Sequence, residues 1–255
     1  MSMQNLIDNC REFKLLGMAQ ALERQLGKPQ IDDLSFPERL MLLLDHERTH
    51  RSDRRFSSRL KLARLKDSHA AIEDIDFKTH RGLDKSQILA LSSCEWISNK
   101  INIMISGPTG TGKTFIACAL AQRACREGYS CRYFRMPRLL QDLAVSRADG
   151  SYGKLMNTLS KTDLIILDDW GIQPLSDEGK RDFLEVIDDR YKTRSMIITS
   201  QLPIENWFEQ IGDPTIADAI MDRIINSSYK FQLKGKSMRS EDPSLTNQIS
   251  VSKKH

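Results

Sequence analysis

The first seventy residues carry apolar side chains at intervals of three and four positions, which is the spacing of one face of a helix. The clearest set consists of Leu15, Met18, Leu22 and Leu26. The tetrapeptide Ser35-Phe36-Pro37-Glu38 is a capping box, in which a serine and a glutamate pair at the first turn of a helix. We therefore expect a small all-α domain over residues 1–70. A connector with one short helix, residues 85–97, is expected over residues 71–99.

From residue 100 the pattern changes to short apolar runs that alternate with helical stretches, which is typical of a parallel α/β sheet. The predicted strands cover residues 101–106, 131–135, 164–167, 195–199 and 229–233. Helices are expected over residues 113–127, 137–160 and 214–225, and also from Ser176 and from Pro203. The fold class predicted for residues 100–240 is thus α/β, a parallel sheet flanked by helices. The polar residues 241–255 are expected to form a disordered tail.

Composition narrows the class of protein. Of the 255 residues, 40% are apolar and 28% are charged, which excludes collagen-like, low-complexity and wholly disordered chains. No apolar run approaches the roughly 20 residues that span a bilayer, and the N-terminal segment lacks the apolar core of a secretory signal. The five cysteines form no C-x-x-C pair and are expected to be reduced and buried. We expect a cytoplasmic protein without membrane contact.

The net charge of +4 is unevenly distributed along the chain. Residues 47–66 hold eight lysines and arginines against two acids, an excess of +6. Such a stretch is typical either of a solvated helix face or of sequence-independent, salt-sensitive contacts with DNA phosphates. Phe56 is the single aromatic residue of this stretch, so stacking on bases is not expected. The candidate DNA-binding residues are Arg48, Arg51, Arg54, Arg55, Arg59, Lys61, Arg64 and Lys66.

The strongest chemical signal is a complete phosphate-binding loop, G-x-x-x-x-G-K-T, between the predicted strand 101–106 and the predicted helix 113–127. Its glycines allow backbone N–H groups to surround phosphate oxygens, and the helix N-terminus adds a positive dipole. Lys113 is expected to reach the β- and γ-phosphates, and the Thr114 hydroxyl to bind Mg²⁺. The loop therefore predicts a nucleoside triphosphate site. Its residues are Gly107, Pro108, Thr109, Gly110, Thr111, Gly112, Lys113 and Thr114.

Two further strand ends are expected to complete this site. The apolar run Leu164–Leu167 is followed by Asp168 and Asp169. In P-loop enzymes a carboxylate in this place holds the metal ion, so Asp168 is assigned to Mg²⁺ and Asp169 to activation of the attacking water. Gln201 follows the predicted strand 195–199 and can hold the same water. These residues do not by themselves separate a hydrolase from a small-molecule kinase, and many strands end in polar residues.

Six short sequence motifs carry a resemblance to a known family: Gly107–Thr114, Leu167–Gly171, Asp189–Tyr191, Thr199–Pro203, Asp213–Arg223 and Lys234–Arg239. They occur in the order found in the IstB family, the ATPase helpers of bacterial insertion-sequence transposition. The chain resembles this family over most of residues 85–240, and its helical N-terminal part is also similar. The family is related to DnaC-type helicase loaders and DnaA-like AAA+ proteins. The resemblance therefore implies an AAA+ ATPase domain that uses ATP and Mg²⁺.

The resemblance also implies roles for the residues of the nucleotide site. Lys113 and Thr114 correspond to the Walker A motif, Asp168 and Asp169 to the Walker B motif, and Gln201 to sensor 1. Asp169 departs from the glutamate that AAA+ proteins usually carry at its position. An aspartate pair does occur among the transposition helpers.

The same resemblance implies roles for three arginines. Arg223 occupies the place of an arginine finger, which completes the ATP site of a neighbouring subunit. The alternative for Arg223 is a salt bridge to Asp222 or Asp218 on its own helix. Arg239 resembles a sensor-2 arginine, and Arg190 is expected to be structural or to lie at an interface.

An arginine finger that acts in trans requires assembly, and members of the family assemble on DNA. The resemblance therefore implies three partners: further copies of the chain in an ATP-dependent homo-oligomer, double-stranded DNA bound mostly without sequence preference, and the cognate transposase. On this interpretation the chain recruits or stimulates the transposase and hydrolyses ATP. Two alternatives stay open, a DnaC-like loader of a replicative helicase and a nucleotide-gated DNA scaffold in which hydrolysis is incidental.

Overall fold

The computed structural model describes residues 2–26, 33–79 and 81–238. The chain divides into two compact units, Met1–Lys61 and Leu62–His255. This division lies before the domain limit expected at residue 70, and residues 71–99 belong to the second unit instead of forming a connector. The reason is burial, because Ala63, Ile72 and Ile75 all lie in the interior of the second unit. The tail expected over residues 241–255 lies outside the described residues.

The first unit is helical, as the apolar spacing predicts. It contains α1 (Met3–Glu12), α2 (Leu16–Gln25) and most of α3 (Phe36–Ala63), which continues without a break through the basic stretch. Glu38 accepts hydrogen bonds from the backbone N–H (2.8 Å) and the hydroxyl (2.6 Å) of Ser35, as expected for a capping box. The apolar core is small and consists of the buried residues Ile7, Cys10, Ala19 and Leu22.

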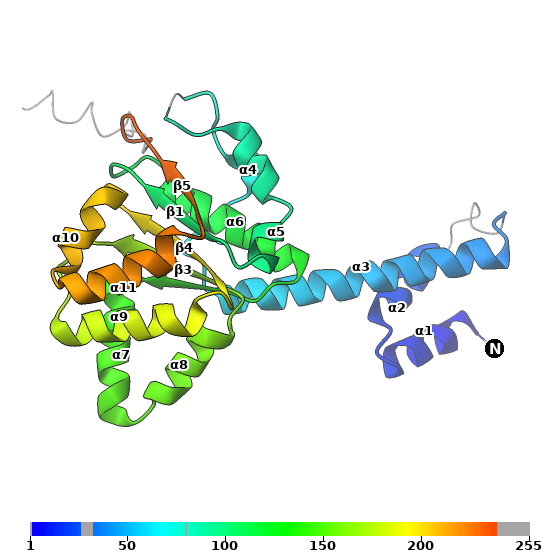
Figure 1. Ribbon diagram of the computed structural model, residues 1–255. Helices are drawn as coiled ribbons and strands as arrows, with labels where there is room; N and C mark the ends of the chain where they lie inside the picture. Colours follow the sequence, from blue (N-terminus) through cyan, green and yellow to red (C-terminus); the bar gives the residue numbers. More distant parts are fainter. Residues whose placement is uncertain (1, 27–32, 80, 239–255) are drawn as a thin grey trace, which may run out of the picture. The chain divides into compact units, whose positions relative to one another are not determined.

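The second unit is built around a parallel five-stranded sheet with the strand order β2-β3-β4-β1-β5 (Figure 1). The strands are β1 (Asn102–Ser106), β2 (Cys131–Arg135), β3 (Leu164–Trp170), β4 (Ser195–Ser200) and β5 (Ser228–Gln232). Each lies where the apolar runs predict a strand. A parallel sheet with helices on its faces confirms the predicted α/β class.

Helices precede the first strand and connect the others. They are α4 (Lys85–Leu91), α5 (Glu95–Ser98), α6 (Lys113–Glu127), α7 (Met136–Asp149), α8 (Tyr152–Lys161), α9 (Asp177–Arg190), α10 (Trp207–Ile211) and α11 (Pro214–Ile225). Two predicted helices are each divided in two. Gly150 (φ 78°) separates α7 from α8, and Cys94 (φ 59°) separates α4 from α5, because a left-handed residue ends a helix.

The two faces of the sheet carry different helices (Figure 1). Met104, Ile165 and Ile198 pack in one large apolar cluster with residues of α7 to α11. Their strand neighbours point to the opposite face, where α6 contacts β2, β3 and β4. The buried strands thus hold the loops at their carboxyl ends, which is where ligands bind in sheets of this class.

Two properties expected from the composition can be compared with the structure. All five cysteines are buried, as expected. Within the described residues, no helix has both the length and the apolar character needed to cross a bilayer.

Candidate nucleotide-binding site

The phosphate-binding loop joins β1 to α6, and its backbone path requires glycine. Gly110 and Gly112 have positive φ angles of 83° and 91°, and Gly112 directly precedes the first turn of α6. Thr111 is buried inside the loop, and its hydroxyl donates a hydrogen bond of 2.9 Å to the carbonyl of Pro108. The loop therefore turns tightly and presents the N-terminus of a 15-residue helix.

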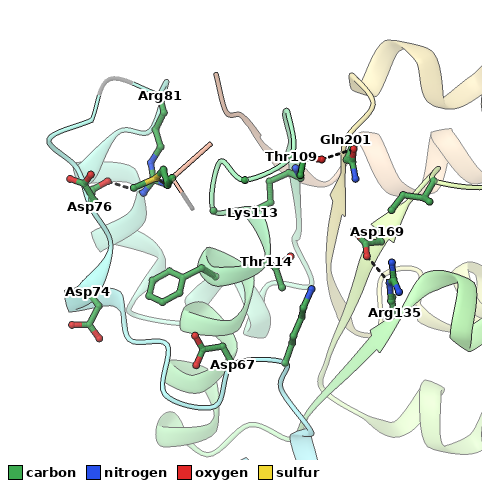
Figure 2. Close-up of a pocket in the computed structure, with 16 residues that line it drawn as sticks. Asp67, Asp74, Asp76, Arg81, Thr109, Lys113, Thr114, Arg135, Asp169 and Gln201 are labelled. Atoms are coloured by element: carbon green, nitrogen blue, oxygen red, sulfur yellow. Dashed lines mark hydrogen bonds and ion pairs between the residues drawn. The ribbon is translucent and has the colours of Figure 1, made fainter. Parts of the chain in front are cut away.

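The loop forms one wall of a cavity of about 860 Å³, which is within the size range of small-molecule sites (Figure 2). Four of the predicted residues that line this cavity are Lys113, Thr114, Asp169 and Gln201. Lys113 and Thr114 follow β1, Asp169 lies near the end of β3, and Gln201 follows β4, so the carboxyl ends of three neighbouring strands meet here. The structure thus brings together residues that lie as far apart in sequence as Thr109 and Gln201.

Lys113 lies almost buried at the start of α6. Its ammonium group donates hydrogen bonds to the carbonyl oxygens of Gly107 (2.6 Å) and Pro108 (2.8 Å) in the loop itself. The charge is therefore held at the mouth of the loop, where phosphate oxygens of a nucleotide would compete for it.

Asp168 is fully buried, with 0% exposure, and several hydroxyl groups surround its carboxylate. Thr114 Oγ1 lies 2.9 Å from Oδ1, the Thr199 hydroxyl also donates to Oδ1, and Tyr133 donates a hydrogen bond of 2.6 Å to Oδ2. Burial, and then the hydrogen bond to Asp168, raise the pKa of Tyr133 well above that of an ordinary phenol. The phenol therefore stays protonated and available as a donor.

Asp169 reaches the cavity because β3 is irregular at this point. Successive side chains of a regular strand point to opposite faces, yet Asp168 contacts Thr114 of the loop and Asp169 lines the cavity. The pairing of β3 with β4 shifts between Leu167 and Trp170, and Asp169 has a positive φ of 66°. Aspartate is among the residues that tolerate this left-handed conformation. The bulge thus turns both carboxylates toward the nucleotide site.

Arg135 at the end of β2 forms an ion pair with Asp169, with 2.7 Å between Arg135 Nε and Asp169 Oδ2 (Figure 2). This hydrogen bond raises the pKa of Arg135. After the neighbouring strand β4, Gln201 Oε1 accepts a hydrogen bond of 2.8 Å from Thr109 Oγ1. Both Asp169 and Gln201 therefore have partners within the protein.

The donor set beside the loop fits Mg²⁺. Thr114 and Asp168 supply hydroxyl and carboxylate oxygens 2.9 Å apart, and these are the hard ligands that Mg²⁺ prefers. Two protein ligands leave the remaining positions to phosphate oxygens and water, as is usual for this ion. Thr114 and Asp168 are thus suited to hold Mg²⁺ together with a nucleotide.

The wall opposite the strand ends comes from residues that the sequence did not single out. Arg81 is 4% exposed and donates hydrogen bonds to the carbonyls of Thr111 (2.7 Å) and Asp76 (2.8 Å). Met238 also lines the cavity, and its backbone N–H donates to the carbonyl of Gly110 (2.8 Å). Arg81 and Met238, together with Lys66, Asp67, Asp74 and Asp76, therefore line the cavity from outside the strand ends.

Arg223 lies on α11 and is not among the residues that line the cavity. Its guanidinium forms an ion pair with Asp188 of α9 and donates a hydrogen bond of 2.8 Å to the carbonyl of Ala219. The acid that pairs with Arg223 is thus neither Asp222 nor Asp218. Arg239 lies outside the described residues.

Arg190 is a structural residue of the second unit. It is fully buried, and its guanidinium donates hydrogen bonds to the carbonyls of Thr162 (2.9 Å) and Ser195 (2.6 Å), among others. It thereby connects the segment before β3 to the start of β4.

The candidate DNA-binding residues divide between the two units. Those from Arg48 to Lys61 lie on α3, where Arg48 and Arg51 form ion pairs with Asp45 (2.9 Å) and Glu47 (2.7 Å) of the same helix. Arg64 follows α3 with a left-handed φ of 50°. Lys66, in contrast, lines the nucleotide cavity.

Sequence reasoning missed Tyr133, Arg135 and Arg81 as residues of this site. Tyr133 and Arg135 lie on β2, and only the pairing of β2 with β3 places them beside Asp168 and Asp169. Single-sequence patterns do not specify which strands are neighbours. Arg81 lies in a segment without helical or strand periodicity, so no pattern pointed to it.

Comparison with known proteins agrees with this geometry. A family model described as IstB-like ATP binding protein matches residues 9–246. An insertion sequence ATP-binding protein of Sinorhizobium fredii (strain NBRC 101917 / NGR234) is 44% identical over 234 residues, which are 91% of this chain and 95% of the relative. The ATP-binding protein of insertion sequence IS1162 from Pseudomonas fluorescens is 47% identical over 203 residues, 80% of this chain and 88% of the relative.

Among solved structures, the DnaC helicase loader superposes with a TM-score of 0.54 at 18% identity. The superposition covers 65% of this chain and 97% of that structure. At this level of identity the likeness concerns the fold alone, and it confirms the expected AAA+ architecture.

Proposed function

The chain belongs to the family of IstB-like ATP-binding proteins and carries an AAA+ ATPase fold, and from this premise we propose that it is the ATP-dependent helper of an insertion-sequence transposase. The observation that carries the proposal is the complete nucleotide site, with loop, paired carboxylates and Gln201 around one cavity, in a chain whose relatives are named after insertion sequences.

In the proposed hydrolysis, each cavity residue acts on a defined group. Lys113 leaves the loop carbonyls and binds β- and γ-phosphate oxygens, while Thr114 and Asp168 hold Mg²⁺. When bound, Mg²⁺ neutralises charge that develops on the β- and γ-phosphates. Asp169 accepts the proton of the attacking water, and Gln201 orients that water. Because Arg135 and Thr109 are the protein partners of these two side chains, Asp169 and Gln201 must exchange them for the water.

Arg223 is proposed to act on the ATP site of a neighbouring copy. Two observations support this role. The side chain lies on α11, away from the residues that line its own cavity, and its ion pair with Asp188 is partly exposed and can open. A cation supplied in trans stabilises transition-state charge and makes hydrolysis depend on assembly. ATP binding and homo-oligomer formation would then be linked. Arg239 is retained as a candidate sensor-2 residue.

Duplex DNA is the proposed second partner, contacted through the cations of α3. Their exposure suits phosphate contacts without base recognition, which would be weakened by salt. The cognate transposase is the proposed third partner, because the relatives are named after insertion sequences. The helicase-loader alternative draws on a likeness of fold alone. A gene adjacent to a transposase gene would favour transposition over helicase loading.

The test is the size of the full chain in solution, measured by light scattering with and without duplex DNA. We expect large assemblies only when DNA and a non-hydrolysable ATP analogue are both present, and small species with ADP. The variant Lys113→Ala serves as the matched control and should not assemble, because it cannot bind the triphosphate. A monomer under every condition, or assembly of Lys113→Ala equal to that of the wild type, would contradict the proposal.

A further inference from the structure

Lys66 occupies a position that its membership of the basic stretch does not explain. It follows the end of α3 at Ala63 by three residues, and its backbone lies against α6. Burial raises the pKa of the Cys118 thiol on α6, while backbone hydrogen bonds from Asp67 and Lys66 act in the opposite direction. The neighbouring Leu65 is buried as well. The main chain at residue 66 is therefore fixed beside the helix that carries Lys113 and Thr114.

The side chain of Lys66 points its charge at the Walker B carboxylate. Lys66 Nζ lies 3.9 Å from Oδ2 of the fully buried Asp168, and Lys66 lines the same cavity as Thr114. The Lys66 side chain is 53% exposed, so its ammonium group can move without opening the core.

Occupation of the metal site changes the charge balance around this lysine. Asp168 would then hold a dication, and an ammonium group on the same carboxylate would be repelled at close range. The flexible four-carbon stem of lysine allows the charge to swing away. Thr114 and Asp168 would hold Mg²⁺ together with the nucleotide, so the triphosphate end would be the anion beside these residues in a loaded site.

We propose that Lys66 is a nucleotide-contacting residue that exchanges Asp168 for the γ-phosphate when the metal–triphosphate complex binds. Lys66 thereby distinguishes a triphosphate from a diphosphate, and it belongs to the ATP site rather than to the DNA-contacting cations. The inference rests on the proposed function only in that ATP and a divalent ion occupy this cavity. Lys61, exposed at the end of the first unit, remains in the DNA-contacting set.

The test compares Lys66→Met with Lys61→Met in the full chain. Equilibrium titration with a fluorescent non-hydrolysable ATP analogue and with fluorescent ADP, both with Mg²⁺, gives the two affinities. For Lys66→Met we expect the triphosphate affinity to fall about 5- to 10-fold and the ADP affinity to change less than about 2-fold. Lys66→Arg should recover most of the triphosphate affinity, because it restores the cation. Lys61→Met should leave both affinities unchanged.

Duplex DNA binding provides the second readout. The slope of log affinity against log salt should stay unchanged in Lys66→Met and fall by about 0.9 in Lys61→Met. Unchanged triphosphate affinity, or an equal loss for both nucleotides, would overturn the assignment of Lys66, and so would a reduced salt slope in Lys66→Met. Failure of the wild type to bind either nucleotide would instead overturn the proposed function, so the two failures are distinguishable.

Discussion

The two compact units both bury a carboxylate, but they do so in different surroundings. In the second unit Asp168 lies within strand β3, and the apolar cluster on this sheet includes a stack of Trp170 on Phe183, with 4.8 Å between ring centroids. In the first unit Glu47 is 6% exposed beside a core of four buried apolar residues. Glu47 accepts hydrogen bonds from the backbone N–H groups of Gly17 (2.7 Å) and Met18 (3.1 Å) at the start of α2.

This contrast separates carboxylates that serve chemistry from a carboxylate that serves folding. The apolar cluster holds the second unit together whether or not its site residues are charged. In the first unit the apolar area is small, so the contact of Glu47 with α2 carries a larger share of the stability. The same substitution of a carboxylate by an amide should therefore change activity in one unit and stability in the other.

Asp169→Asn tests the second unit and should have the largest effect. Asparagine keeps the shape of the side chain and also tolerates the positive φ of 66°, so the bulge of β3 should persist. The amide cannot accept a proton from water. We expect steady-state ATP hydrolysis to fall at least about 100-fold, while affinity for the ATP analogue changes less than about 2-fold.

Asp177→Asn is the matched control, because Asp177 is an exposed acid that also forms an ion pair, with Lys180 at 2.9 Å. It should hydrolyse ATP at the wild-type rate. Mixing Asp169→Asn with Arg223→Ala should restore part of the activity if Arg223 serves a neighbouring site. Retention of near-wild-type hydrolysis by Asp169→Asn would exclude Asp169 as the base. An Asp169→Asn protein that has lost hydrolysis but still assembles and supports full transposition would favour the nucleotide-gated scaffold.

Sequence patterns predicted some features of the two units and missed others. Continuous apolar runs located β1, β3 and β4, because a strand buried on both faces leaves such a signal. The edge strands β2 and β5 are mostly not buried and carry a weaker signal, although they too lie where strands were predicted. The helix breaks at Gly150 and Cys94 were not predicted, because the apolar spacing continues on both sides of one left-handed residue. The boundary between the units at Lys61 was not predicted, because it lies inside an unbroken helix, α3.

The residues of the nucleotide site divide in a similar way. The loop is one continuous segment, and the two carboxylates are adjacent residues at the end of an apolar run. Sequence spacing alone was therefore enough to predict them as site residues. Tyr133, Arg135 and Lys66 act on those carboxylates from other segments, and only the tertiary arrangement brings them within reach. The bulge that turns Asp169 into the cavity likewise has no signature in an apolar run.

Glu47→Gln tests the first unit and should have an intermediate effect. Burial opposes ionisation of Glu47, but hydrogen bonds from Arg51, Met18 and Gly17 outweigh it and lower its pKa. The charged contact with α2 therefore stabilises the unit above the unfolded pKa of 4.5 and is lost as the pH falls through the lower, folded pKa. We expect the free energy of unfolding of the first unit to be about 1–2 kcal/mol lower in the amide variant.

Hydrogen exchange of the full chain measures this loss locally. Backbone amides of α2 should exchange faster in Glu47→Gln at neutral pH, and amides of β3 should not change. Asp45→Asn, which removes an ion pair with Arg48 on the same helix, is the control and should leave α2 protected. Unchanged protection of α2 in Glu47→Gln would show that the apolar core suffices for the first unit.

Tyr133→Phe tests whether the second unit also tunes its site through hydrogen bonds, and it should have the smallest effect. The substitution removes the hydroxyl that donates to Asp168 Oδ2 and leaves the Thr114 and Thr199 hydroxyls to hold the carboxylate. We expect the Mg²⁺ concentration for half-maximal binding of the ATP analogue to rise about 3- to 10-fold, with the thermal midpoint nearly unchanged. Tyr129→Phe is the control, because Tyr129 hydrogen-bonds to Ser98 (2.6 Å) away from the cavity. An unchanged Mg²⁺ requirement in Tyr133→Phe would mean that the Tyr133 hydroxyl is not needed to orient Asp168, and that the Thr114 and Thr199 hydroxyls are sufficient.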